Sequence, residues 1–219
     1  LVTAPINKHA WDLAGIEFPG HTELLADRCG TDRYGMMLMG KGLRVFIATR
    51  HVPLREVAQV LGAHDVQLGV ELLSEGLPLL GVEQPRIAVC GLNPHAGDGG
   101  TLGSEEQEWI DPLVRRLQAE GYGVSGTHPA DTVFHQAVKG EYDAVVAMYH
   151  DQGLAPLKLL AFDEGVNVTL GLPMIRTSPD HGTAFGIAGK GVARPDSMRH
   201  ALLAAAELIQ QPNPWTPQP

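Results

Sequence analysis

The stretch RIAVCGLNPHAGDGGTLGSEEQEWIDPLVRRLQA, residues 86–119, decides the fold. It opens with Arg86–Leu92, a short and mostly apolar run that is typical of a buried strand. A glycine-rich loop follows, and Ser104–Ala119 then carries apolar residues at the spacing of an amphipathic helix. Ser104 and Gln107 match a capping box, which predicts that the helix begins there. Strand, loop and helix in this order are the repeating unit of α/β folds.

The same alternation extends over the rest of the chain. Further strands are expected at Gly35–Met39, Leu43–Thr49, Ala144–Tyr149 and Val166–Leu170. Further helices are expected at Leu54–Leu61, Val66–Leu73, Thr132–Val138 and Ser197–Gln210. A Gly-Lys-Gly turn at 40–42 predicts a hairpin between the first two strands. We therefore expect an α/β fold, with a mainly parallel sheet that has helices on both faces.

The composition is that of a globular protein, with 44% hydrophobic and 19% charged residues. The formal net charge of −9 argues against a nucleic-acid partner and against an anionic membrane surface. No apolar run is long enough to span a bilayer, and Cys29 and Cys90 are too few for a disulfide framework. We expect a cytoplasmic protein with neither nucleic-acid nor membrane partners.

Both ends of the chain carry a signal of their own. The first residues are LVTAPINK, without an initiator Met, and Leu1–Thr3 is expected to be the end of a strand. We therefore interpret the chain as a piece of a longer protein. The prolines within Gln211–Pro219 predict a frayed C-terminal tail.

Three histidines follow three of the predicted strands: His51, His95 and His150. Because the carboxyl ends of parallel strands meet at one edge of a sheet, we expect their imidazoles to project there. Three neutral imidazoles suit Zn²⁺ or a similar divalent metal, and Asp151 is placed to support a ligand or to act as a base. A structural role for each histidine is an equally open interpretation. The histidines without such context, His64, His128, His135 and His200, are taken as structural.

A second group of residues suits an anionic substrate. His21 and Thr22 open a probable helix, whose free N–H groups favour phosphate. Lys158, Asn167 and Arg176 follow the His150 strand at intervals of nine residues, and the two cations would clamp phosphate or carboxylate. Isolated cations of this kind are more often solvated surface charges, so both interpretations stand.

Six longer strings resemble the 4-hydroxythreonine-4-phosphate dehydrogenase family. They are TRHVPL (49–54), GLNPHAG (91–97), PADT (129–132), MYHDQG (148–153), GVNVTLGLP (165–173) and IRTSPDHGTA (175–184). The resemblance runs from Leu1 to about Ile209 and lacks the family's N-terminal segment. It implies a two-lobed fold like that of isopropylmalate dehydrogenase, with the active site at a homodimer interface. Residues 1–181 would form the metal-binding, substrate-binding and dimerisation lobe, and residues 182–219 a remnant of the cofactor-binding lobe.

The resemblance also implies roles for particular residues. His51, His95 and His150 match ligands of one divalent metal ion (Zn, Mg, Co or Mn), in a site shared between two subunits. His21, Thr22, Lys158, Asn167 and Arg176 match substrate contacts. His181, Gly182, Thr183 and Ala184 resemble a loop that contacts NAD or NADP. Asp131, Asp151 and Lys8 are the candidates for proton transfer.

The implied reaction is NAD(P)-linked oxidation and decarboxylation of 4-phosphohydroxy-L-threonine. The product is 3-amino-2-oxopropyl phosphate, for pyridoxine 5'-phosphate biosynthesis, and a metal ion would lower the pKa of the substrate hydroxyl. Two alternatives stay open. One is a sister dehydrogenase that acts on a 4-phospho-threonate or an aromatic cis-dihydrodiol. The other is an inactive fragment that only binds metal or dimerises.

Overall fold

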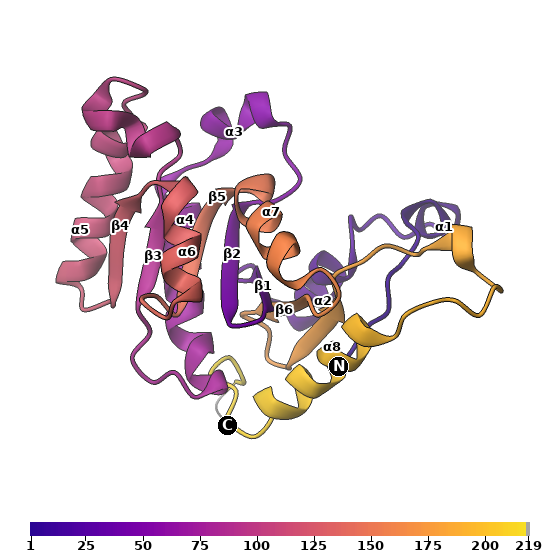
Figure 1. The fold of residues 1–219 in the computed structure, drawn as a ribbon. Helices are drawn as coiled ribbons and strands as arrows, with labels where there is room; N and C mark the ends of the chain where they lie inside the picture. Colours follow the sequence, from indigo (N-terminus) through magenta and orange to yellow (C-terminus); the bar gives the residue numbers. More distant parts are fainter. Residues whose placement is uncertain (218–219) are drawn as a thin grey trace.

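The computed structural model describes residues 1–217. A seven-stranded sheet of order β4-β3-β5-β2-β1-β6-β7 forms its centre (Figure 1). The strands are β1 (Gly35–Gly40), β2 (Leu43–Thr49), β3 (Ile87–Cys90), β4 (Val124–His128), β5 (Ala144–Tyr149), β6 (Val166–Leu170) and β7 (Arg176–Pro179). The helices are α1 (Lys8–Leu13), α2 (His21–Cys29), α3 (Leu54–Val60), α4 (Ala63–Gly76), α5 (Asp111–Ala119), α6 (Ala130–Val138), α7 (His150–Ala161) and α8 (Asp196–Leu208).

The sheet is mixed, and its parallel part carries the predicted site. Strands β4, β3, β5 and β2 are parallel neighbours, whereas β1 returns antiparallel to β2 through the hairpin at 40–42. Strands β6 and β7 continue the antiparallel part. The α/β fold and the hairpin are therefore confirmed, and the three histidine-bearing strands are direct neighbours in the sheet.

Helices α4 and α7 cover opposite faces of the sheet. Successive residues of a strand point to opposite faces. A Cβ added to Gly69 of α4 would lie 2.7 Å from the Phe46 ring, and one added to Gly153 of α7 would lie 2.6 Å from Ile47 Cδ1. Both helices thus approach β2 at a glycine, which allows their backbones to pack closely against it.

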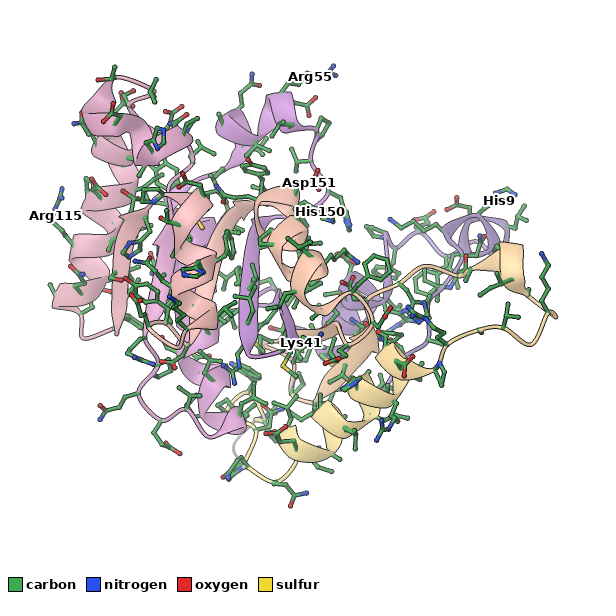
Figure 2. All side chains as sticks on the ribbon, viewed as in Figure 1. His9, Lys41, Arg55, Arg115, His150 and Asp151 are labelled. Atoms are coloured by element: carbon green, nitrogen blue, oxygen red, sulfur yellow. The ribbon has the colours of Figure 1, made fainter. Side chains whose placement is uncertain are left out.

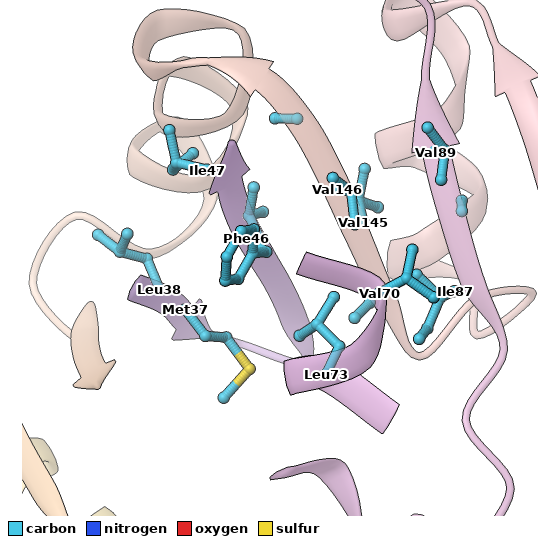
Figure 3. Close-up of a cluster of buried hydrophobic side chains, with 14 of the residues drawn as sticks. Met37, Leu38, Phe46, Ile47, Val70, Leu73, Ile87, Val89, Val145 and Val146 are labelled. Carbon is cyan, nitrogen blue, oxygen red and sulfur yellow. The ribbon is translucent and has the colours of Figure 1, made fainter. Parts of the chain in front are cut away.

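The main core lies between α4 and the sheet. Figure 3 shows Val70 and Leu73 of α4 beside Met37 and Phe46 of the sheet. Fully burying one such side chain contributes about 1.5–3 kcal/mol. The largest completely buried side chains include Met37, Leu72, Leu73, Leu77, Ile87, Ile110, Leu117 and Met148.

Several elements differ from those expected. Helix α7 begins at His150, directly after β5, and contains Gly153 and Pro156, residues that disfavour helix in isolation. Strands β4 and β7 are rich in Ser, Thr and other polar residues and were not expected. Strand β7 is polar because Arg176 and Thr177 on it form hydrogen bonds with other parts of the chain.

The helix expected at Ser104–Ala119 begins differently from its prediction. A π-helical turn at Glu106–Ile110 precedes α5, and no side chain caps either element within the described part of the chain. The predicted capping box of Ser104 and Gln107 is therefore wrong. Its physical reason is that Glu106 turns its carboxylate back toward Asn93, which fixes the chain before the helix.

The two ends of the described chain both contact the sheet. Val2 forms a parallel bridge with Thr177 of β7, so the expected strand end at Leu1–Thr3 is confirmed. The prediction of a fraying tail stays a prediction, although residues 211–217 include two side chains that bond to the rest of the chain. Asn213 donates to the carbonyl of Leu172 at 3.0 Å, and the Trp215 indole donates to Glu75 at 2.5 Å. Residues 218–219 lie outside the described part.

Helix α8 is tied to the strands before it. Ser197 donates to the carbonyl of Gly165 at 2.7 Å, and Thr177 donates to the carbonyl of Ala201 at 2.8 Å. The division into lobes at residues 181 and 182 stays a prediction. None of the helices in residues 1–217 is both long and apolar enough to cross a lipid bilayer.

Candidate functional site

The carboxyl ends of β2 and β5 bring two of the three predicted metal ligands together. His51 follows β2 and His150 begins α7, and their ring centroids are 5.8 Å apart. Figure 2 shows His150 and Asp151 on the side of the molecule that also carries Arg55 of α3, whereas Lys41, in the turn between β1 and β2, lies nearer the middle of the view. A cavity of about 420 Å³ opens here, and its lining includes both histidines, Arg50 and Tyr149.

The donor set at His150 suits a metal ligand. Its Nδ1 lies 2.7 Å from Oδ1 of Asp151. A carboxylate can only accept, so Nδ1 carries the proton and a neutral ring keeps its Nε2 lone pair for a ligand. A carboxylate behind a metal-binding imidazole fixes its orientation in many metal sites. Asp151 is therefore placed as a support for His150, and this pair fits a divalent metal.

The third predicted ligand, His95, is carried by a loop that follows another strand. It lies on the turn Pro94–Gly100 after β3 and is exposed. Within residues 1–217, no three His, Cys, Asp or Glu side chains of one chain gather into a metal-binding group. A three-histidine metal site therefore stays a prediction.

One side chain that the sequence did not single out joins the ends of β3 and β5. The Gln152 side chain accepts from the main-chain N–H of Met148 at 2.7 Å and donates to the carbonyl of Gly91 at 2.8 Å. It therefore links the start of α7 to the beginning of the loop that carries His95. Gln152 belongs to the string MYHDQG, but its role depends on β3 lying beside β5, which the string alone does not show.

Arg176 of β7 forms the centre of the second predicted cluster. The residue is only 4% exposed. Nη1 donates to the hydroxyls of Thr169 and Thr22, at 3.0 and 3.3 Å, and Nη2 donates to the hydroxyl of Thr3 at 2.7 Å. No carboxylate of residues 1–217 forms an ion pair with it. A buried charge without a counter-charge is costly, so this arrangement favours an anionic ligand.

Three buried polar atoms of the described residues have no hydrogen-bond partner: Arg50 Nη1, Asn167 Oδ1 and Arg176 Nε. A buried polar atom without a partner is destabilising, and such atoms are common where a ligand binds. Two of the three belong to predicted substrate contacts. Arg50 is an addition, which lies against the Tyr34 ring at 5.3 Å.

Electrostatics connects the two clusters. Burial, followed by the positive charge of Arg176, lowers the pKa of His21. Burial, followed by the charge of Lys8, lowers the pKa of His51. Burial lowers the pKa of Arg176 to about 10, against an opposing effect of Glu23. Both imidazoles are thus favoured in the neutral form, and Lys8 and Glu23 act within electrostatic range of the site.

Helix α2 positions His21 and Thr22. It begins after Gly20, and the His21 ring packs edge-on against Trp11 with centroids 5.2 Å apart. Thr22 is buried and accepts from Arg176, and it does not cap the helix. The predicted residues His21, Thr22 and Arg176 therefore lie in one cluster of neighbouring side chains.

Lys158 and the predicted cofactor residues lie in a neighbouring region. The Lys158 ammonium pairs with the Asp180 carboxylate at 2.9 Å. A groove of about 550 Å³ is lined by Lys158, Asp180, His181, Gly182 and Ala184, among others. Thr183 lines the adjoining groove with Phe185 and Gly189. His181 and its neighbours are exposed or half-exposed there, and their role in cofactor binding stays a prediction.

Asp131 stands in the first turn of α6, just beyond the end of β4, and is exposed. It occupies the same edge of the sheet as the histidines, because β4 is parallel to β3 and β5. Its role in proton transfer stays a prediction, as do those of Asp151 and Lys8. The His128 ring forms a hydrogen bond of 2.9 Å with the Ser125 hydroxyl and packs against the Tyr142 ring. Both contacts are typical of a structural histidine.

Comparison with known proteins identifies relatives over nearly the whole chain. Residues 1–205 match the family model "Pyridoxal phosphate biosynthetic protein PdxA". A 4-hydroxythreonine-4-phosphate dehydrogenase of Ruegeria sp. (strain TM1040) is 55% identical over 98% of this chain and 66% of its own length. The solved structure of a 4-hydroxythreonine-4-phosphate dehydrogenase from Klebsiella pneumoniae superposes with a TM-score of 0.87 at 47% identity, over 94% of this chain and 63% of that one.

A more distant structure is also similar. A terephthalate 1,2-cis-dihydrodiol dehydrogenase from Burkholderia xenovorans LB400 superposes with a TM-score of 0.73 at 30% identity, over 93% of this chain and 65% of that one. In each comparison the chain spans about two thirds of the relative's length.

Proposed function

The chain belongs to the PdxA family of pyridoxal phosphate biosynthetic proteins, and on that premise we propose that it oxidises a phosphorylated 4-hydroxythreonine with a nicotinamide cofactor. The observation that carries the proposal is Arg176, a buried guanidinium that donates to three threonine hydroxyls and forms no ion pair with a carboxylate of residues 1–217. A phosphate would supply the missing negative charge and accept from the unpartnered Nε.

Two groups of residues in this chain would bind the two ends of the substrate. Arg176, Thr22 and His21 bind the phosphate end, with α2 offering its first main-chain N–H groups. His51 and His150 face the reacting end, where the secondary hydroxyl loses a proton and its carbon loses a hydride. Oxidation at that carbon gives a β-keto acid, whose carboxyl bond to the α-carbon then breaks to release CO₂.

The histidines are suited to hold a divalent metal, and NAD or NADP would accept the hydride. When bound, such a metal would stabilise negative charge on the substrate oxygen, and the nicotinamide would take the hydride. His150 is oriented for this by Asp151, and burial favours the neutral form of His51. Lys8, Asp131 and Asp151 are the proposed groups for moving protons.

We further propose that His95 reaches this site from a second copy of the chain. Within residues 1–217 of one chain, His95 does not join His51 and His150 in a metal-binding group, which supports this arrangement. In a two-fold dimer, His95→Ala and His150→Ala subunits would complement each other at one of their two sites. Mixing equal amounts of the two inactive variants should restore about a quarter of the wild-type activity. No recovery after subunit exchange would contradict a shared site.

The proposed reaction is tested by following NADH or NADPH absorbance with 4-phosphohydroxy-L-threonine as substrate. The protein is first treated with a chelator, and Zn²⁺, Mg²⁺, Co²⁺ or Mn²⁺ is then restored separately. We expect metal-dependent reduction together with release of CO₂. His64→Ala, an exposed histidine of α4, is the matched control and should leave the rate unchanged.

A cis-dihydrodiol dehydrogenase is the second candidate, because a structure with that name superposes on this chain. The cis-dihydrodiol of terephthalate belongs in the same substrate panel. Turnover of that diol without turnover of the phosphorylated amino acid would replace the first proposal by the second. Metal binding without turnover of any substrate would favour the interpretation as an inactive metal-binding fragment.

A further inference from the structure

The loop that carries His95 has an unusual backbone. Six consecutive residues, 95–100, have positive φ angles between 44° and 92°. Three of them, His95, Ala96 and Asp98, are not glycine. L-residues normally visit this left-handed region singly and not as a continuous turn. The turn therefore requires a fixed support from the surrounding structure.

The support is a buried carboxylate. Glu106 is only 2% exposed. Its Oε1 accepts from the main-chain N–H of Asn93 at 2.8 Å, and its Oε2 accepts from the Asn93 side chain at 3.0 Å. No lysine, arginine or histidine of residues 1–217 forms an ion pair with Glu106. Both of its carboxylate oxygens therefore accept from Asn93, the residue directly before the turn Pro94–Gly100.

Glycines make room for this carboxylate. A Cβ added to Gly97 would lie 2.6 Å from Glu106 Oε2, and one added to Gly91 would lie 3.2 Å from Oε1. A Cβ added to Gly103 would lie 2.3 Å from Nδ2 of Asn93. The backbone therefore packs closely against Glu106 and Asn93 at three points: before the turn, within it and after it.

We propose that Glu106 is a positioning residue for His95, which it holds in a left-handed turn so that the imidazole is presented outward from its own chain. The role of His95 as a metal ligand in this statement rests on the proposed function. Glu106 itself touches neither substrate nor metal. Its effect passes through Asn93 to the turn, and from the turn to the imidazole.

Glu106→Gln is the discriminating substitution, because it keeps the size of the side chain. The new amide can accept only one of the two hydrogen bonds from Asn93. Rotating the Asn93 amide to accommodate it would turn Asn93 Oδ1 toward the Glu105 carboxylate, which now accepts from Nδ2 at 2.7 Å. Either arrangement leaves one repulsive contact. Glu108→Gln, on the same π-helical turn and exposed, is the matched control.

Two measurements on the folded protein test the proposal. The first is amide hydrogen exchange without metal, at Ala96 and Leu102, whose N–H groups bond inside the loop to Asn93 and Gly97. We expect exchange there to be at least about tenfold faster in Glu106→Gln, with Val145 of β5 unchanged. The second is calorimetric titration with Zn²⁺, where we expect an affinity about 10–100-fold weaker. Glu108→Gln should match the wild type in both.

Unchanged loop exchange, or unchanged Zn²⁺ affinity beside a wild type that binds Zn²⁺, would overturn the positioning role. A wild type that binds no divalent metal would instead refute the proposed metal site. The exchange measurement would then still decide whether Glu106 holds the turn. If circular dichroism shows Glu106→Gln unfolded, Asn93→Ala carries the same test, because it removes one of the two bonds and keeps the carboxylate.

Discussion

The guanidinium of Arg176 donates to the hydroxyl of Thr3 at 2.7 Å, which joins two residues 173 positions apart in the sequence. Thr3 is held next to β7 because Leu1–Thr3 pairs with that strand. The beginning of the chain therefore forms one wall of the proposed phosphate pocket. No motif of the sequence assigned Thr3 to this pocket, since its role depends entirely on that long-range pairing.

Replacing Arg176 by lysine should weaken the binding of a phosphorylated substrate. Lysine keeps the charge but cannot reproduce the forked donation to three hydroxyls. Losing a hydrogen bond to a charged group costs about 1.5–3 kcal/mol, so we expect KM to rise about 10–100-fold. Steady-state kinetics checks this, with Arg28→Lys on the exposed face of α2 as the control. A KM equal to that of the wild type would exclude Arg176 from phosphate binding.

Asp151→Asn should lower metal affinity while leaving the fold intact. The neutral amide accepts more weakly from Nδ1 of His150, which lies 2.7 Å from the carboxylate. Loss of such a supporting carboxylate typically weakens metal binding about 10–100-fold. Titration with Zn²⁺ or Co²⁺ measures the effect, and Asp27→Asn, exposed on α2, is the control. Equal affinities for the three proteins would show that Asp151 does not orient His150.

Asp143→Asn should destabilise the protein at neutral pH and much less in acid. The Arg86 side chain holds the pKa of Asp143 below its usual value, with main-chain and side-chain bonds of 2.8 to 3.0 Å. A lowered pKa in the folded state gives stability above the unfolded pKa, about 3.9, that is lost as the pH falls through the lower folded value.

Thermal unfolding across this pH range tests the coupling. We expect the wild type to have the higher Tm at pH 7 and the difference to shrink below about pH 4. Glu141→Gln, an exposed neighbour, serves as the control and should show no such dependence. A difference in Tm that stays constant across the range would mean that ionisation of Asp143 has no part in it.

Gly69→Ala should destabilise the core between α4 and the sheet. The added Cβ would lie 2.7 and 2.8 Å from two atoms of the Phe46 ring, both of which are too close. Overpacking of this kind costs about 1–3 kcal/mol, which denaturant unfolding can measure. Phe46→Leu in the same chain should recover part of the loss, because it removes the ring atoms in question. Strictly additive effects would indicate that the two positions do not clash.

The strands that carry the site could be predicted from the sequence. The apolar runs of β2 and β5 end abruptly at polar residues, so their limits matched the prediction. Their parallel pairing follows from the intervening helices, and it places His51 near His150. Local pattern was sufficient here, because both strands are largely buried and their sequences are mostly apolar.

The remaining elements depend on tertiary contacts. Helix α7 contains Gly153 because Val45, Ile47 and Ala147 leave no room for a side chain there. Its local propensity is therefore poor, and the sequence reads as a loop. Strand β7 is polar because it turns Arg176 and Thr177 toward partners elsewhere in the chain. The left-handed turn at His95 requires Glu106, whose direction only the folded chain determines.

The Gln152 side chain links β5 to the residue after β3, beyond the last paired residues of these two strands, Val89 and Val146. It therefore restrains the distance between the two strand ends. One amide side chain, bonded at 2.7 and 2.8 Å at its two ends, sets how far the root of the His95 loop lies from the start of α7. Fraying of a strand end requires far less free energy than global unfolding. Mild heat or denaturant that separates these strand ends should therefore abolish activity while the core still reports a native protein.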